Sequence, residues 1–288
     1  MTVGELLAEA TAALAATSDS PRLDADLLLG EILGHGRTWL RTWPETAVED
    51  PLATRFREQV ARRAAGEPVA YLVGRTGFHA IDLAVSPATL IPRPETEELV
   101  ERALVLGGAL GSDRARVLDV GTGSGAIALA LATARPDWEV AATEASPEAL
   151  AVARANAAEL GLERVALHAG NLLAGLEGPW ELIVSNPPYV AANDPHLDTG
   201  DVAFEPRGAL ASGPDGLDCL RRLAAEAPGR LAPGGWLLVE HGYDQGPAVR
   251  DLFTRAGLVE VTTHRDLAGQ ERLTEGRLAG GTALNPPA

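Results

Sequence analysis

The stretch that most restricts how this chain of 288 residues can fold is Val117-Leu-Asp-Val-Gly121-Thr-Gly123-Ser-Gly125-Ala126. A short apolar run leads directly into three alternating glycines, and an apolar, helix-like segment follows at 127–134. Glycines at such a turn let the backbone approach a ligand closely and leave amide N–H groups exposed at the start of a helix. The stretch therefore predicts a strand, a ligand-binding turn and a helix in that order, which is a building unit of α/β proteins.

Further apolar runs alternate with helical stretches along most of the chain. The strand candidates are 116–120, 140–143, 165–168, 182–185, 236–240 and 259–263. The spacers between them are long enough for crossover helices, so we expect a doubly wound, Rossmann-like α/β sheet.

The N-terminal region has a different, helical pattern. Thr2-Val-Gly-Glu5 has the form of a capping box, and Ser20-Pro21 and Asp50-Pro51 mark two further helix starts. The apolar stripe expected on the second helix consists of Leu23, Leu27, Leu28, Ile32 and Leu33.

Short β-like runs between residues 78 and 91, broken by Ser86-Pro87, indicate a hairpin, and Pro94-Glu-Thr-Glu-Glu98 opens another helix. We therefore expect a small all-α domain at 1–75, a β-hairpin linker at 76–92 and the α/β domain at 93–288, with a loose tail from about Ala279.

Composition limits the classes of partner. A net charge of -16 disfavours direct, sequence-independent binding to nucleic acid. The N-terminus has no basic segment, and no apolar stretch approaches the ~20 residues that span a membrane, so we expect a cytoplasmic protein without membrane contact. The single cysteine, Cys219, agrees with a reducing compartment. The six histidines lack zinc-like spacing, and no metal is predicted.

Glu144 ends the strand candidate that follows the glycine turn. An acid at this place can accept hydrogen bonds from both ribose hydroxyls of an adenosine cofactor. Gly121, Gly123 and Ala126 also satisfy the dinucleotide pattern G-x-G-x-x-G/A, so an NAD enzyme remains possible from these residues alone.

A third motif, Asn186-Pro-Pro-Tyr189, stands at the end of a later strand candidate, which faces the cofactor across the cleft in this topology. A nitrogen in an amide or in adenine is a poor nucleophile because its lone pair is delocalised. Hydrogen-bond acceptors for its N–H groups, here the Asn186 side chain and the Pro187 carbonyl, push electron density back onto nitrogen. Asn186 is held extended by the proline that follows it, and Tyr189 can lie flat against the planar group. The motif favours methyl transfer to such a nitrogen.

With these motifs, the chain resembles the HemK/PrmC family of release factor glutamine methyltransferases over nearly its whole length. The stretches that carry the resemblance are Gly66-Glu-Pro-Val-Ala-Tyr-Leu-Val-Gly74, Val85-Ser-Pro-Ala-Thr-Leu-Ile-Pro-Arg-Pro-Glu-Thr-Glu97, the turn at 121–125, Asn186–Tyr189, Phe204-Glu-Pro-Arg207 and Asp266-Leu-Ala-Gly-Gln270. The resemblance implies a seven-stranded S-adenosylmethionine-dependent methyltransferase domain behind a small helical substrate-recognition domain.

The resemblance also implies roles for individual residues. The catalytic residues would be Asn186, Pro187 and Tyr189, and the substrate glutamine would bind at Asn186, Pro187, Pro188 and Tyr189. The S-adenosylmethionine site would comprise Gly121, Thr122, Gly123, Ser124, Gly125, Glu144, Asn171, Leu172 and Asn186. This chain departs from the family in having Glu144 in place of an aspartate, Asn171 in place of the aspartate that meets the adenine amino group, and Leu172 in place of an aromatic residue.

Four functions are compared on these grounds. The first is methylation of the glutamine N5 in the Gly-Gly-Gln motif of peptide chain release factors. An adenine N6-methyltransferase is the alternative, because Asn-Pro-Pro-Tyr serves an exocyclic amine by the same physics, but it would need a flipped base and a basic surface. An NAD-dependent oxidoreductase has only the glycine turn in its favour. The intact Asn186–Tyr189 motif argues against a cofactor-binding regulator without catalysis.

Overall fold

The computed structural model describes residues 1–110 and 114–280. Most of the tail expected from about Ala279 therefore lies outside the described residues. The chain forms two compact units. We call the first the helical unit, Met1–Thr76 together with Asp198–Phe204, and the second the sheet unit, Gly77–Leu197 together with the chain from Glu205 onward.

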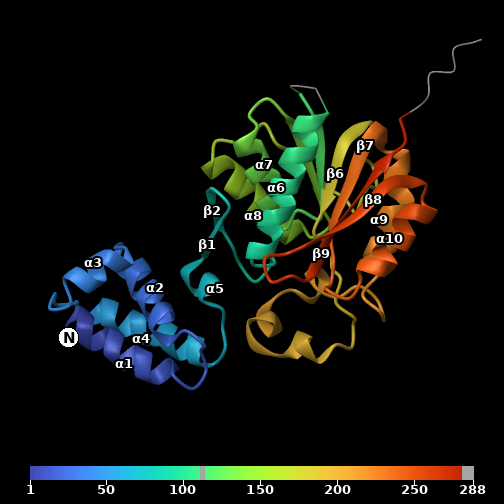
Figure 1. The fold of residues 1–288 in the computed structure, drawn as a ribbon. Coiled ribbons are helices and arrows are strands. Elements are labelled where there is room, and N and C mark those ends of the chain that lie inside the picture. Colours follow the sequence, from blue (N-terminus) through green and yellow to red (C-terminus); the bar gives the residue numbers. More distant parts are fainter. Residues whose placement is uncertain (111–113, 281–288) are drawn as a thin grey trace, which may run out of the picture. The chain divides into compact units, whose positions relative to one another are not determined.

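The helical unit has a core of its own, and Figure 1 shows its helices. Its helices are α1 (Val3–Leu14), α2 (Pro21–Leu33), α3 (Arg37–Thr42), α4 (Asp50–Ala64) and α5 (Val69–Val73). The capping box at Thr2 and Glu5 is present, with both reciprocal bonds formed. The short segment η2 (Gly200–Phe204) belongs to this unit, where Asp201 forms a 2.7 Å ion pair with Arg63 of α4.

Two details of the helical unit differ from expectation. The buried face of α2 includes Ala25, Leu28 and Leu29, whereas Leu23 and Leu27 are exposed, so the expected stripe was displaced. The Ser20 hydroxyl bonds the side chain of Asp24 and does not cap the helix backbone. Both differences have one cause: Asp24 and Asp26 are buried because they pair with arginines, so this helix does not follow a simple apolar stripe.

The sheet unit is built on seven strands in the order β5-β4-β3-β6-β7-β9-β8. The strands are β3 (Arg116–Val120), β4 (Glu139–Glu144), β5 (Ala166–Ala169), β6 (Trp180–Ser185), β7 (Leu231–Glu240), β8 (Leu258–Arg265) and β9 (Glu271–Leu278). Strands β3 to β7 are all parallel to one another, and β9 is antiparallel to both β7 and β8. The expected seven-stranded α/β fold is confirmed.

Helices cover both faces of this sheet (Figure 1). They are α6 (Pro94–Ala109), α7 (Ala126–Ala134), α8 (Pro147–Glu159), α9 (Asp218–Glu226) and α10 (Gly246–Arg255). Buried residues of α6, α7 and α8 form one core with the sheet, and those of α9 and α10 form the other. From β3 the strand order runs outward to β4 and β5, and the chain then returns to add β6 on the other side of β3. The gap between β3 and β6 is therefore the topological switch point where ligands of such folds bind.

Strand β9 was not among the strand candidates. Its sequence, ERLTEGRL, has charged residues where a buried strand usually has apolar ones. Glu275 is nevertheless buried, because both its carboxylate oxygens accept bonds from Arg102 of α6 at 2.6 Å. A charge neutralised by a partner distant in sequence therefore hid this strand from the hydropathy pattern.

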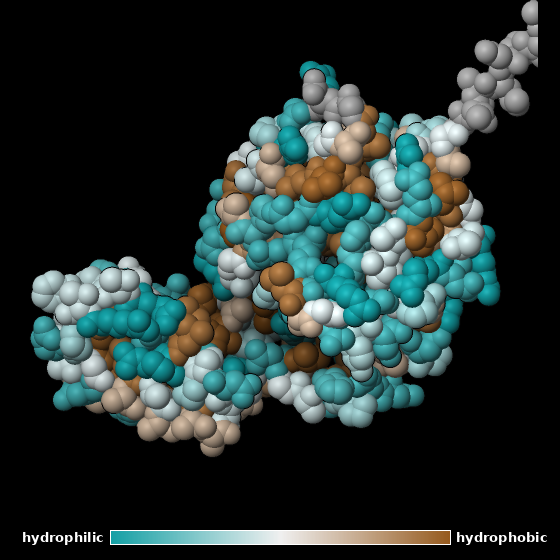
Figure 2. Space-filling model, in the orientation of Figure 1, coloured by the Kyte–Doolittle hydropathy of each residue, from teal (hydrophilic) through white to brown (hydrophobic). Residues whose placement is uncertain are grey.

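The hairpin consists of β1 (Arg75–Phe78) and β2 (Ile81–Ala84). Ser86-Pro87 lies beyond the second strand, in a turn closed by the Thr89 N–H on the Ser86 carbonyl, and not between the strands as expected. Phe78, Ile81 and Leu83 are buried in the sheet unit's core. Figure 2 shows that hydrophilic and neutral residues cover most of the visible face of the sheet unit. Within residues 1–110 and 114–280 we find no helix long and apolar enough to cross a bilayer.

Candidate active site

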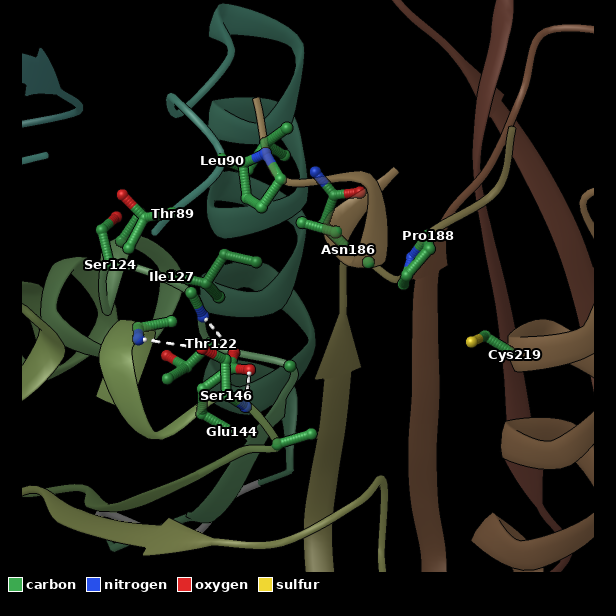
Figure 3. Close-up of a pocket in the computed structure, with 18 of the residues that line it drawn as sticks. Thr89, Leu90, Thr122, Ser124, Ile127, Glu144, Ser146, Asn186, Pro188 and Cys219 are labelled. Carbon is green, nitrogen blue, oxygen red and sulfur yellow. Dashed lines mark hydrogen bonds between the residues drawn. The ribbon is translucent and has the colours of Figure 1, made fainter. Parts of the chain in front are cut away.

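A cavity of about 520 Å³ opens at the carboxyl ends of β3, β4 and β6, within the size range of small-molecule sites. Figure 3 shows Thr122, Glu144 and Ser146 together on one side, Asn186 and Pro188 on another, and Cys219 beyond them. Of the residues predicted for the site, Gly121, Thr122, Gly123, Ser124, Glu144, Asn171, Leu172, Asn186 and Pro188 line this cavity. Gly125, Pro187 and Tyr189 are not among its lining residues.

The glycine turn is shaped by left-handed backbone conformations, with φ of 57° at Gly123 and 90° at Gly125. A Cβ atom at Gly125 would stand 2.8 Å from the Leu129 side chain, whereas at Gly123 it would meet none of the described residues within 4 Å. Gly125 therefore permits close packing of the turn on α7, whereas Gly123 is needed only because the backbone there is left-handed. The buried Asn156 of α8 holds the turn from behind, since its Nδ2 donates to the Ser124 carbonyl at 2.8 Å.

Asp119 is fully buried beneath the turn. Its Oδ2 accepts from the Thr122 hydroxyl at 2.6 Å and from the Ala128 N–H at 3.1 Å, so it joins β3, the turn and α7. Its Oδ1 is buried without a hydrogen-bond partner in the part of the chain that the structure describes. Burial raises the pKa of Asp119 to about 7, against the opposing effect of the two hydrogen bonds.

Glu144 is bound to the backbone on both sides. Its Oε2 accepts from the Gly123 N–H at 2.8 Å and its Oε1 from the Ser146 N–H at 2.9 Å (Figure 3). Each carboxylate oxygen has a second lone pair, so both remain able to accept from a ligand hydroxyl. The carboxylate is thereby fixed in position at the end of β4, and the turn is tied to it.

Asn171 and Leu172 lie on the same cavity. The Asn171 Oδ1 accepts from Nη1 of Arg222 on α9 at 3.2 Å, so a positive charge stands beside the amide. Leu172 has a φ of 54°, a conformation that is costly for a residue with a Cβ atom. Such strain is concentrated at ligand sites, where the surrounding structure holds it in place.

The Asn186–Tyr189 segment follows β6 directly. Nδ2 of Asn186 donates to the Thr96 hydroxyl on α6 at 2.9 Å, and the Tyr189 hydroxyl bonds Oε1 of Glu240 at 3.0 Å. Burial, followed by the nearby Glu240 carboxylate, raises the pKa of Tyr189, which therefore stays a neutral hydroxyl. Gln245 supports the segment by donating to the Tyr189 carbonyl at 2.9 Å.

The sequence reasoning missed Thr96, Arg222 and Glu240. Thr96 and Arg222 line the cavity, and Glu240 is buried behind it. Glu240 could have been found, because it ends a parallel strand as Glu144 does. The sequence around Thr96 indicates only the start of a helix, and no local pattern distinguishes Arg222 from other arginines.

The chain is similar to known proteins over most of its length. Residues 5–74 match the PrmC N-terminal domain and residues 103–206 the methyltransferase small domain. The release factor glutamine methyltransferase of Pseudomonas aeruginosa is 52% identical over 263 residues, covering 91% of this chain and 94% of that protein. The enzyme of the same name from Xylella fastidiosa is 53% identical over 268 residues, covering 92% and 96%. This chain belongs to the release factor glutamine methyltransferase family.

Family membership makes the chain an S-adenosylmethionine-dependent methyltransferase and removes the NAD-dependent oxidoreductase and the non-catalytic regulator from consideration. A solved methyltransferase from Pyrococcus furiosus shares the fold at 20% identity, with a TM-score of 0.54 over 78% of this chain and 99% of that chain. The cavity suits the family's cofactor in size, and backbone N–H groups, a fixed carboxylate and an amide line it.

Proposed function

We propose that this protein transfers a methyl group from S-adenosylmethionine to the side-chain N5 of the glutamine in the Gly-Gly-Gln motif of peptide chain release factors. The names of its relatives support the substrate. The observation that carries the proposal is the orientation of Asn186: its Nδ2 is bound to Thr96, which leaves Oδ1 to accept a hydrogen bond from a substrate amide.

The chain's own residues prepare the nucleophile. Asn186 Oδ1 and the Pro187 carbonyl accept hydrogen bonds from the two N–H groups of the substrate amide. These bonds raise the electron density on the nitrogen and orient its lone pair toward the methyl group. Pro188 forms the neighbouring wall, and the Tyr189 ring lies beside the amide plane. Bound S-adenosylmethionine would supply the electrophilic methyl group of its sulfonium and leave as S-adenosylhomocysteine, while the methylated nitrogen would release one proton to solvent.

For the cofactor we assign three groups of residues. Gly121, Thr122, Gly123, Ser124 and Gly125 hold its methionine part, with Asn186 bordering the same space. Glu144 accepts from the ribose hydroxyls with the lone pairs that the backbone leaves unused. Asn171, with Arg222 beside it, and Leu172 border the adenine.

We assign recognition of the intact release factor to the helical domain, residues 1–75, joined by the linker at 76–92 to the catalytic domain at 93–288. Support for a separate domain comes from the core of the helical unit, whose residues all lie within 1–75. We place this reaction in the cytoplasm. The net charge of -16 disfavours direct contact of the protein with nucleic acid.

The test is incubation with labelled S-adenosylmethionine and either a release factor containing Gly-Gly-Gln or adenine-containing DNA, followed by mass spectrometry. One added methyl on the Gly-Gly-Gln glutamine is the expected result. Label on adenine, or on another residue type of the release factor, contradicts the proposal. A release factor with Gly-Gly-Ala in place of Gly-Gly-Gln is the matched control and should remain unlabelled.

A further inference from the structure

Glu240, at the end of β7, lies behind the Asn186–Tyr189 segment in a buried hydrogen-bond network. Its Oε2 is 2.7 Å from the Thr96 hydroxyl and its Oε1 is 3.0 Å from the Tyr189 hydroxyl. The Thr96 hydroxyl is also the group to which Asn186 donates, at 2.9 Å. Glu240 and Thr96 are 3% and 4% exposed, so water does not compete for these bonds. The network joins α6, β7 and the segment after β6 within the sheet unit.

The donor and acceptor roles in this network follow from its geometry: the Thr96 hydroxyl donates to Oε2 of Glu240 and the Tyr189 hydroxyl donates to Oε1. Both carboxylate oxygens are therefore used as acceptors, and each of the two hydroxyls gives its proton to one of them. A threonine hydroxyl has one proton, and once that proton points at Glu240 the oxygen offers only lone pairs to Asn186. The amide must then turn its Nδ2 toward Thr96 and its Oδ1 toward the substrate.

We propose that Glu240, acting through Thr96, is a positioning residue that sets which end of the Asn186 amide faces the substrate. The reverse orientation would present an N–H donor to the N–H groups of the target amide, and the acceptor on which methyl transfer depends would be lost. Glu240 is not among the residues that line the cavity, so its effect is transmitted and not direct.

The surroundings of Glu240 contain opposing charges. Burial has the largest effect and leaves the pKa of Glu240 above its ordinary value; Glu95 of α6 adds to the rise, whereas the bonds from Thr96 and Tyr189 and the charge of Arg272 on β9 oppose it. Arg272 is itself held 3.4 Å from Asp266. The two hydroxyl donors and the guanidinium of Arg272 act against this rise.

The test compares Thr96→Val, which keeps the side-chain shape but removes the hydroxyl, with Thr96→Ser, which keeps the hydroxyl. Rates are measured with S-adenosylmethionine and a Gly-Gly-Gln release factor. We expect kcat to fall by about tenfold or more in Thr96→Val, with the KM for the release factor and the affinity for S-adenosylhomocysteine little changed. Thr96→Ser should restore most of kcat. A folded Thr96→Val with the parent's kcat overturns the proposal.

Glu240→Gln tests the charge, because a glutamine must donate to one of the two hydroxyls. We expect a lower kcat, and we expect the double variant with Thr96→Val to lose no more than Thr96→Val alone, since both changes act on the same amide. Losses that multiply show that Glu240 acts by another route and overturn the proposal. Should Thr96→Val not fold, Glu240→Gln decides alone, and the parent's kcat in that variant overturns the proposal.

Glu275→Gln is the matched control. Like Glu240, Glu275 is 3% exposed and does not line the cavity, but it bonds Arg102 and not Thr96 or Tyr189. It should keep the parent's kcat; a loss equal to that of Glu240→Gln would show a general effect of removing a buried charge and overturn the proposal. The inference rests on the proposed function, and the two fail differently. A parent that methylates no Gly-Gly-Gln substrate contradicts the function, whereas a parent and variants that methylate it equally fast contradict only the role of Glu240.

Discussion

Asn186 is the residue on which the proposed chemistry depends most. Asn186→Ala removes the side-chain acceptor for the target amide, while the glycine turn and Glu144 remain to hold the cofactor. Turnover of a Gly-Gly-Gln release factor should fall by a factor on the order of 100 or more, the scale for a lost catalytic hydrogen bond. Tyr189→Ala should act more mildly, because it removes a wall and leaves the acceptors.

The measurement for Asn186→Ala is the initial rate of methylation together with calorimetry of S-adenosylhomocysteine binding, which should change little. Asn193→Ala is the control, because Asn193 is exposed in the loop that follows the motif. If Asn186→Ala turns over as fast as Asn193→Ala, Asn186 has no part in the reaction.

Glu144 combines a structural and a binding role. Glu144→Ala removes two backbone bonds, to Gly123 and Ser146, together with the charged acceptor proposed for the ribose. Affinity for S-adenosylhomocysteine should weaken by about 1.5–3 kcal/mol in calorimetry. Glu148 is an exposed acid in the first turn of α8, and Glu148→Ala should leave the affinity unchanged. Equal affinities of both variants would refute the ribose assignment.

Asp119 should make stability depend on pH. Its pKa is about 7 in the folded protein and near 3.8 when exposed, so its contribution is complete below about pH 3.8 and is lost as the pH rises through 7. Asp119→Asn cannot titrate. From pH 5 to pH 8 the variant should therefore gain stability relative to the parent, by on the order of a few kcal/mol. Urea unfolding at the two pH values measures this, and a difference that does not vary with pH contradicts it.

Among the structural elements, the turn before α9 supports the catalytic segment. Gly216 has a φ of 78°, and a Cβ atom there would stand 2.2 Å from the Tyr189 carbonyl oxygen. Gly216→Ala should therefore displace the backbone after Pro188 and lower the methylation rate, while S-adenosylhomocysteine still binds, because the glycine turn is elsewhere.

Gly161→Ala is the matched control for this variant. Gly161 has a φ of 66°, and no atom of residues 1–110 or 114–280 lies within 4 Å of the position of a Cβ there. The change therefore costs only backbone strain, about 1–2 kcal/mol of stability. Both variants should lose comparable stability from the strain, and only Gly216→Ala should lose activity beyond it. Equal activity per folded molecule would show that the approach to Tyr189 has no functional consequence.

At the level of the whole protein, the two units have separate cores. Deletion of residues 1–75 should leave S-adenosylhomocysteine binding intact, since every residue that lines the cavity lies in the sheet unit. Methylation of an intact release factor should fall sharply if the helical domain recognises it. A short Gly-Gly-Gln peptide should be methylated equally, and slowly, by the parent and the truncated protein. Normal methylation of the intact release factor by the truncated protein would refute the recognition role.

Local pattern alone was enough to predict the glycine turn, six of the seven strands and the positions of Glu144 and Asn186. These features depend on short-range chemistry: glycine at left-handed positions, proline after an extended residue, and polar groups where parallel strands end. The pattern failed where a distant partner changes the cost of burial, as at Asp24 in α2 and Glu275 in β9, because hydropathy treats a paired charge as an exposed one.

Only the tertiary structure brought together Thr96, Asn186 and Glu240, which are up to 144 residues apart in the chain. The motif predicts that Asn186 accepts a hydrogen bond from the substrate, but its letters do not say which end of the amide faces the cavity. That orientation depends on the Thr96 hydroxyl proton, which is donated to Glu240. The two hydrogen bonds at Thr96 join α6, β7 and the segment after β6, so they form only once the fold has brought these three elements together.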